Sequence, residues 1–299
     1  MSFPTPHKDK LIKAIENPKC TEGDKQLLKD AQDVYQKWIN DTDNLTSTGE
    51  YRVREMVSLL NKYKDYLEVE IIMKEGSPFL RRQKGQLKLD NSVLEEFLIH
   101  LVRPEVIQRV SNIDKLVVGP QEAFMSLAFF PRSVEDLSHK PSLTVKTKDQ
   151  DFVIGTRIHY KFSPQEDFPE NLTEKGELLV AVLSAEVKVN LDKTMFQEAA
   201  GTAGRLKQGV PVGRYYLLVE YLDMTPEDPR LTAIDNVFIL RRAKRLSVHK
   251  RDSIEEVENQ HKQHPIDAGV IWKFVCEIQS FVDSVLYEPE KSLERGSFV

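Results

Sequence analysis

The sequence has few of the residues that define several common classes of protein. Its 299 residues include two cysteines, Cys20 and Cys276, too few for a disulfide framework or a cysteine-based zinc site. No apolar run reaches the length needed to cross a membrane, and the first ten residues, MSFPTPHKDK, lack the apolar stretch of a secretory signal. We therefore expect a reduced, cytoplasmic setting and no membrane partner.

Motifs for nucleotide binding and zinc hydrolysis are also missing. The glycine-containing stretch GTAG at 201–204 lacks the lysine that a phosphate-binding loop needs, and the seven histidines show no HExxH spacing. The composition is 40% apolar and 30% charged, which is ordinary for a globular protein with a substantial core. Function must therefore be sought in the distribution of the charged residues.

Basic residues gather in one part of an acidic chain. The net charge is −5, yet the stretch 236–251, NVFILRRAKRLSVHKR, holds six Lys or Arg residues and no acid. Such a basic ridge suits local contact with nucleic-acid phosphates, although a solvated basic face gives the same pattern. The DNA-contacting candidates are Arg132, Arg241, Arg242, Lys244 and Arg245.

The pattern of apolar residues predicts an α/β protein in three parts. Residues 1–90 read as a helical N-terminal region, 91–250 as the core with five strands, and 251–299 as a C-terminal helical segment. Within the core, Ser92 and Glu95 form a capping box, which predicts a helix that starts at Val93. A second core helix is expected at about 194–207.

One predicted strand carries charges in an unusual place. In the stretch LSAEVKVNL (183–191) the odd positions are apolar, as they are from 179 onward, which predicts one face that stays in the core. The other face becomes polar at Ser184 and continues with Glu186 and Lys188. Asp151 begins the preceding predicted strand with its side chain on the polar face. If the two strands pair, these charged side chains meet at one edge of the sheet.

Such a set of residues can perform metal-assisted hydrolysis. The carboxylates of Asp151 and Glu186 and the carbonyl of Val187 are the hard oxygen ligands that Mg²⁺ prefers. The metal lowers the pKa of a bound water, and Lys188 can orient or deprotonate that water. A surface ion pair between Glu186 and Lys188 would produce the same local pattern.

These residues resemble the PD-(D/E)XK nuclease pattern. The half-motifs are QD at 150–151 and EVK at 186–188, although Gln150 replaces the usual proline and the gap between them is long. The resemblance implies a mixed sheet flanked by helices and a Mg²⁺-dependent nuclease. Because of the departures, Asp149 or Asp167 could replace Asp151 as the first metal-binding acid.

The resemblance extends to two flanking helices. Gln197 follows the EVK strand where many such nucleases carry a supporting glutamine, and SVLEEFL (92–98) resembles an early helix whose glutamate leans toward the metals. That role is carried to Glu95 or Glu96, with helix capping as the competing role for Glu95.

At finer grain, residues 80–245 look like restriction endonuclease subunits of the BbvCI type, which pair as unlike subunits. The implied function is type II restriction cleavage of a specific double-stranded DNA sequence, by a dimer of like or unlike subunits. A structure-specific repair nuclease of the same fold and a non-catalytic DNA-binding protein are the alternatives.

Overall fold

The computed structural model describes residues 3–83, 89–107, 115–282, 284 and 289–296. The helices that precede the sheet are α1 (Pro6–Ile15), α2 (Glu22–Asp43), α3 (Gly49–Asp65), the π-helix η1 (Tyr66–Lys74), α4 (Pro78–Gln83) and α5 (Leu89–Leu101). The strands and the helix between them are β1 (Val117–Phe129), β2 (Leu143–Phe162), β3 (Glu174–Leu191), α6 (Lys193–Gly209), β4 (Arg214–Leu222) and β5 (Asn236–Lys244). The C-terminal helices are α7 (Val248–Arg251), α8 (Ile254–Gln263), α9 (Ala268–Val282) and α10 (Ser292–Arg295). Short 3₁₀ turns are η3 (Glu135–Ser138), η4 (Glu170–Leu172), η5 (Pro229–Leu231) and η6 (Pro289–Lys291).

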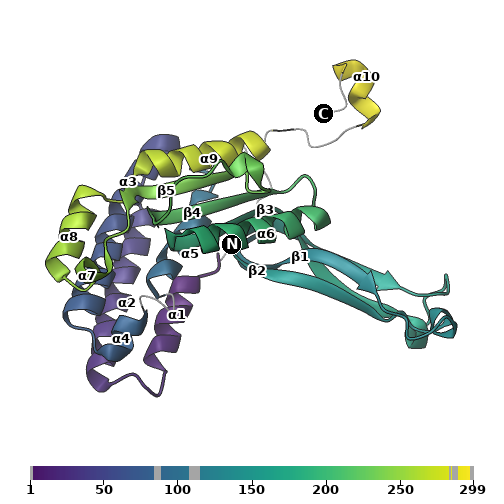
Figure 1. The fold of residues 1–299 in the computed structure, drawn as a ribbon, viewed down its shortest axis with the longest axis horizontal. Helices are drawn as coiled ribbons and strands as arrows, with labels where there is room; N and C mark the ends of the chain where they lie inside the picture. The colour runs from purple at the N-terminus through teal and green to yellow at the C-terminus, as the bar shows by residue number, and fades with distance from the viewer. Residues whose placement is uncertain (1–2, 84–88, 108–114, 283, 285–288, 297–299) are drawn as a thin grey trace.

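The five strands form one mixed sheet in the order β1-β2-β3-β4-β5, antiparallel up to β3 and parallel beyond it. The N-terminal helices, α5 and α9 share a continuous apolar core with one face of the sheet, and α6 covers the other face. Figure 1 shows this arrangement, with the N-terminal helices on one side of the sheet and α9 along its upper edge. The predicted α/β class is confirmed.

The strands differ in detail from those expected. The predicted strand LTVKT and the next predicted strand are both parts of β2, so Asp151 lies inside a strand and does not begin one. The sheet still has five strands because it includes β1, a strand that the sequence pattern did not predict. It contains Gly119 with φ +106° and Pro120, residues that read as a turn, and it shifts register at that point.

Strand β2 bends sharply near its middle. Phe129, paired with one end of β2, has its ring centroid 5.6 Å from that of Phe162 at the other end, although a straight strand of this length would separate the ends by about 60 Å. Lys140 Nζ likewise lies 2.7 Å from Glu174 Oε2, which joins the two hairpin ends. The β1–β2 and β2–β3 hairpins therefore lie alongside each other and form the arm that projects from the body in Figure 1.

A register shift between Ile154 and Gly155 accompanies this bend. A Cβ atom at Gly155 would lie 2.4 Å from the carbonyl oxygen of Val180, so glycine is needed for the strands to approach there. Because of this shift, the prediction that the odd positions of β3 share one core face is wrong. Ala181 packs in the core on the α6 side, whereas Leu183 packs in the core against the N-terminal helices. The odd positions of β3 thus do not share one face.

Two buried histidines link the N-terminal helices to α5 and tie the stability of the fold to pH. His7 is fully buried, with its ring nitrogens 2.8 Å from the Ser92 hydroxyl and 2.6 Å from the Tyr63 hydroxyl. Burial, and then the positive charges of Lys10 and Lys64, lower the pKa of His7 to about 3. Burial, and then Arg103, lower the pKa of His100 to about 4.

We predict that stability falls as the pH drops from about 6.5 to about 4. The unfolded chain then binds protons at both histidines while the folded chain does not, so each histidine contributes a slope of about 1.4 kcal/mol per pH unit. Urea unfolding of His7→Gln across this range should show a slope smaller by about that amount. His159→Gln, at a side chain that is 78% exposed, is the control and should keep the wild-type slope. Equal slopes in both variants would contradict the prediction.

Candidate active site

At the bend in β2, the strands β2 and β3 separate, and we call this point the fork. The predicted site lies at this fork. The pairing of the two strands ends at Phe152, opposite Ala185, so the backbone of Val187 has no partner from β2. The Asp151 carboxylate takes the place of that partner, because its Oδ2 accepts a hydrogen bond of 2.8 Å from the Val187 amide. The structure therefore brings Asp151 to the EVK stretch, as the sequence predicted.

Glu186 and Lys188 lie beside Asp151 on the α6 side of the sheet. Lys188 Nζ is 2.6 Å from Glu186 Oε1, and the side chains are 27% and 21% exposed respectively. The other oxygen, Glu186 Oε2, accepts a 2.6 Å hydrogen bond from the hydroxyl of Tyr215. Tyr215 lies on the parallel strand β4, opposite Ser184, which precedes Glu186 by two residues on β3. Glu186 is thus held by contacts to both of its oxygens.

These contacts keep Glu186 ionised despite its partial burial. Burial acts to raise the pKa of this carboxyl group, but the charge and hydrogen bond of Lys188 and the hydrogen bond of Tyr215 lower it by more. Lys148, on the part of β2 that enters the arm, lies close enough to lower the pKa further. The net result is a pKa below the ordinary glutamate value, so the carboxylate is available as a ligand at neutral pH.

Helix α5 brings a further polar group to the fork. The Asn91 amide donates a 3.1 Å hydrogen bond to the carbonyl oxygen of Val187 and a longer one, 3.4 Å, to Glu95 Oε1. Glu95 is also paired with Lys10 Nζ at 2.9 Å. Glu96 points elsewhere, because its oxygens accept from the His7 amide and the Tyr35 hydroxyl. Of the two glutamates, Glu95 is therefore the one that approaches the fork.

The capping-box prediction is wrong. Helix α5 begins at Leu89, four residues earlier than expected, so Ser92 lies inside the helix and its hydroxyl donates to the carbonyl of Leu89 at 2.7 Å. Ser92 also contacts His7, and this tertiary contact satisfies its side chain within the helix. Glu95 consequently has no capping role that competes with its place near the fork.

The other sequence candidates lie farther from the fork. Asp149 is exposed and lies opposite Glu122 in the β1–β2 strand register, in the arm. Asp167 lies in the β2–β3 connection, beyond Glu174, which is about 40 Å along β3 from Glu186. Gln197 is exposed in the first turns of α6, the helix that follows β3. Of the three aspartates, Asp151 is the one whose carboxylate contacts the EVK stretch in a recorded hydrogen bond.

One predicted DNA contact is corrected by the structure. Arg241 is 1% exposed and its guanidinium is ion-paired with Glu220 at 2.8 Å, which also pairs with the buried Lys64 at 3.0 Å. A register shift near the end of β5, with φ +48° at Arg242, accompanies this inward placement. Lys64 and Arg241 are both buried and both pair with the buried carboxylate of Glu220. This is a structural network, because an arginine that left it would leave the carboxylate charge buried without a full set of partners. Arg241 cannot reach DNA in this arrangement.

The remaining basic candidates are accessible but dispersed. Arg132 is exposed in the loop at the end of the arm. Arg242 is 59% exposed and pairs with Asp267 at 3.2 Å, while Lys244 is exposed at the end of β5. Arg245 is 32% exposed, pairs with Asp223 at 3.5 Å and lines a cavity beside the fork.

The chemistry of the fork fits a hard divalent cation. It offers the carboxylates of Asp151 and Glu186 and the carbonyl of Val187, all oxygen donors, and the carbonyl keeps one lone pair beside its bond to Asn91. Within the residues that the structure describes, no group of three or more His, Cys, Asp or Glu side chains could hold a metal ion. A cation here would thus complete its shell with water, as Mg²⁺ commonly does.

Three functional candidates escaped the sequence reasoning. Tyr215 and Asn91 reach the fork from β4 and α5, and Lys148 reaches it from the arm. Only the register of β3 with β4 could have pointed to Tyr215, and the register is not visible in the sequence. Asn91 lies next to the predicted capping box, where its polarity reads as a helix end.

Comparison with known protein families identifies the chain. A mixed sheet with helices on both faces and an oxygen-rich fork is a scaffold suited to a hydrolase. The profile described as Bpu10I restriction endonuclease matches residues 86–298, so the chain belongs to the Bpu10I restriction endonuclease family. It is therefore a member of a family of nucleases that act on DNA.

A solved structure has the same fold. The chain titled "native BbvCI A2B2 tetramer at low resolution" superposes with a TM-score of 0.61 and 16% sequence identity, over 96% of this chain and 100% of that one. A comparison with curated proteins gave no match. No helix within the described ranges is long and apolar enough to span a membrane.

We predict that Tyr215→Phe lowers DNA cleavage and shifts its pH profile. Loss of the hydroxyl removes one contact that lowers the pKa of Glu186, so the acidic limb of the rate profile should move to higher pH. The loss of one such hydrogen bond corresponds to about a three- to tenfold lower rate. Tyr216→Phe is the matched control, because Tyr216 packs on the opposite face against Phe274. An unchanged pH profile in Tyr215→Phe would contradict the assigned contact.

Proposed function

We propose that this chain is a subunit of a type II restriction endonuclease that hydrolyses phosphodiester bonds at a specific double-stranded DNA sequence with Mg²⁺. The observation that carries the proposal is the convergence of Asp151, Glu186 and Lys188 at the fork between β2 and β3. These residues resemble the half-motifs of the PD-(D/E)XK pattern, apart from Gln150 and the long gap, and membership of a restriction endonuclease family supports sequence-specific cleavage over a repair role.

The residues of the fork would have distinct roles. Asp151, Glu186 and the Val187 carbonyl would hold Mg²⁺, which when bound supplies Lewis acidity and lowers the pKa of a water molecule. Lys188, released from its ion pair with Glu186, would orient the attacking water and stabilise negative charge on the phosphoryl oxygens. Glu95 would act through Asn91 on the Val187 carbonyl. Gln197 remains a proposed supporting residue, which would have to approach the site when DNA binds.

Contacts to DNA are proposed for the accessible basic residues. Arg132, Arg242, Lys244 and Arg245 would contact phosphates or base edges from the arm and from the end of β5. Residues 91–250 would form the catalytic core, with residues 1–90 and 251–299 as helical additions, and the match over residues 86–298 includes that core. A reduced, cytoplasmic setting is part of this proposal.

We predict that the wild-type chain cuts plasmid and phage DNA in Mg²⁺ into discrete fragments, or nicks it at one site. Lys188→Ala should lower cleavage at least a hundredfold, as expected for loss of a group that acts in the transition state. Lys175→Ala is the matched control, because Lys175 is exposed on the same strand in the arm. Chelation with EDTA should abolish cutting, and Mg²⁺ should restore it.

Other results would separate the alternatives. Cleavage that depends on branches or mismatches would favour a repair nuclease. No cleavage by the wild type, with DNA still bound, would indicate a non-catalytic chain or a missing subunit. In that case, Lys188→Ala should alter stability alone, as a simple ion pair would.

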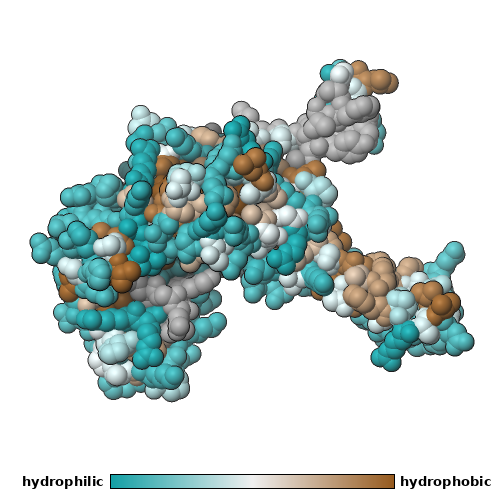
Figure 2. All heavy atoms as spheres, in the orientation of Figure 1, coloured by the Kyte–Doolittle hydropathy of each residue, from teal (hydrophilic) through white to brown (hydrophobic). Residues whose placement is uncertain are grey.

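Assembly with a second subunit is part of the proposal. One catalytic fork cuts one strand, so a double-strand break needs two, from a like or an unlike subunit. Several exposed apolar side chains lie on the arm, namely Phe129, Phe130, Val134, Leu137, Ile158 and Phe168. Figure 2 shows apolar surface gathered on the projecting arm. The similar solved protein is titled an A2B2 tetramer, in which each subunit occurs twice. We propose that these side chains contact the arm of a second copy of this chain.

We predict that Phe130→Ser combined with Leu137→Ser reduces the size of the assembly. Sedimentation at micromolar concentration should show an oligomer for the wild type and a monomer for this double variant. Leu231→Ser, at a side chain that is 87% exposed outside the arm, is the control and should sediment like the wild type. A double variant that keeps the wild-type size would show that the arm is not the contact.

A further inference from the structure

A cavity lies beside the fork. Its volume is about 570 Å³, and it lies between the end of β3, the π-helix η1 and the C-terminal helices α7 and α8. Lys188 and Asn190 form part of one wall, so the cavity opens next to the proposed reaction centre. A cavity of this size is large enough for one nucleotide unit.

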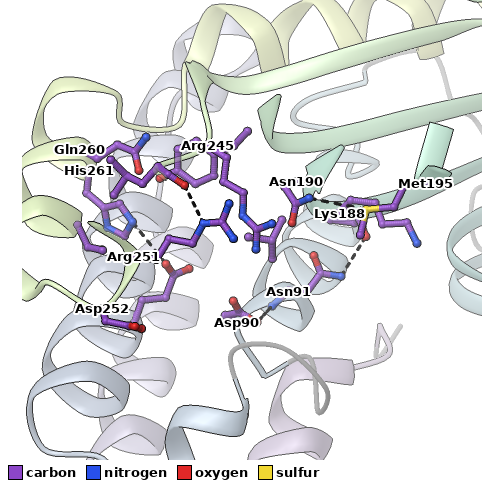
Figure 3. Close-up of a pocket in the computed structure, with 16 residues that line it drawn as sticks. Asp90, Asn91, Lys188, Asn190, Met195, Arg245, Arg251, Asp252, Gln260 and His261 are labelled. Carbon is purple, nitrogen blue, oxygen red and sulfur yellow. Dashed lines mark hydrogen bonds and ion pairs between the residues drawn. The ribbon is translucent and has the colours of Figure 1, made fainter. Parts of the chain in front are cut away.

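Two arginines point into the middle of this cavity, which we call the arginine pocket. Figure 3 shows the guanidinium groups of Arg245 and Arg251 side by side, between Gln260 and His261 on one wall and Asn91 and Asn190 on the other. Arg251 Nε donates a 2.7 Å hydrogen bond to the carbonyl of Leu246, which fixes its direction.

The two arginines share a carboxylate only at long range. Asp223 Oδ2 lies 3.5 Å from Arg245 and 3.7 Å from Arg251, and the charge of Asp192 also acts on Arg245. Burial, and then the charge of Arg251, lower the pKa of Arg245.

Three acids lie in the walls, Glu68, Asp90 and Asp252. Glu68 is already paired with Lys64 and lies 3.5 Å from His261. A bound anion would relieve the repulsion between the two guanidinium groups.

The rest of the lining includes apolar surface. Tyr221 lines the cavity with a side chain that is 7% exposed. Met195 and Val257 add apolar surface to the lining, which suits a sugar or a base.

We propose that the arginine pocket binds one nucleotide unit of the DNA strand next to the cleaved phosphodiester. Its phosphate lies on Arg245 and Arg251, and its sugar or base packs against Met195 and Val257. This subsite rests on the proposed function, because it places the strand beside Lys188. It positions the substrate and takes no part in the chemical step.

Binding of a random-sequence duplex in EDTA tests the phosphate contacts without cleavage. Each lost phosphate contact lowers the slope of log K against log[salt] by about 0.9. Arg245→Gln and Arg251→Gln should each show this loss. Arg230→Gln is the matched control, because Arg230 forms an exposed ion pair with Asp228 and does not line the cavity. Slopes equal to that of the control would overturn the inference.

The outcomes also separate the subsite from the catalytic proposal. Cleavage by the wild type with control-like slopes in the arginine variants would overturn the subsite alone. Reduced slopes without any cleavage by the wild type would overturn the catalytic proposal and leave a DNA-binding pocket.

Discussion

The sharp bend of β2 is the constraint on which the candidate site depends. A strand that stayed paired with β3 would use the Val187 amide and carbonyl for the ladder between them. Because β2 turns into the arm at Asp151, the amide is left to the Asp151 carboxylate and the carbonyl to Asn91. The bend needs close backbone approach at Gly155, where a side chain would collide with β3. One local irregularity thus creates both the arm and the fork.

Burial of charge explains which ionic residues belong to the fold and which to function. Lys64, Glu220 and Arg241 are all at most 1% exposed and satisfy one another between η1 and the sheet. Such a network carries a desolvation cost that only mutual pairing offsets, so its members cannot leave it to bind DNA. Glu186 and Lys188 differ because each keeps about a quarter of its side chain in solvent. Their ion pair can therefore open at modest cost and exchange its partners for a ligand.

The C-terminal helices connect the fork to the rest of the protein. Helix α9 belongs to the main core, and α8 packs beside η1 through Val257 and His261. Through these contacts the arginine pocket is built from segments that are distant in sequence, from η1 to α8. The fork and the pocket share the wall formed by Asn91 and Lys188. A strand of DNA that reaches one would therefore pass the other.

The sequence alone determined the α/β class, the EVK strand, the following helix and the oxygen-donor chemistry, because these follow from local periodicity and residue type. It could not determine which partners the side chains meet. The merger of two predicted strands into β2, the contact of Tyr215 with Glu186 and the choice of Glu95 over Glu96 depend on strand register and helix packing. The same holds for Arg241, which reads as a basic strand end like Arg242 but faces a buried carboxylate. Tertiary structure decided these points because a register shift of one residue exchanges the two faces of a strand.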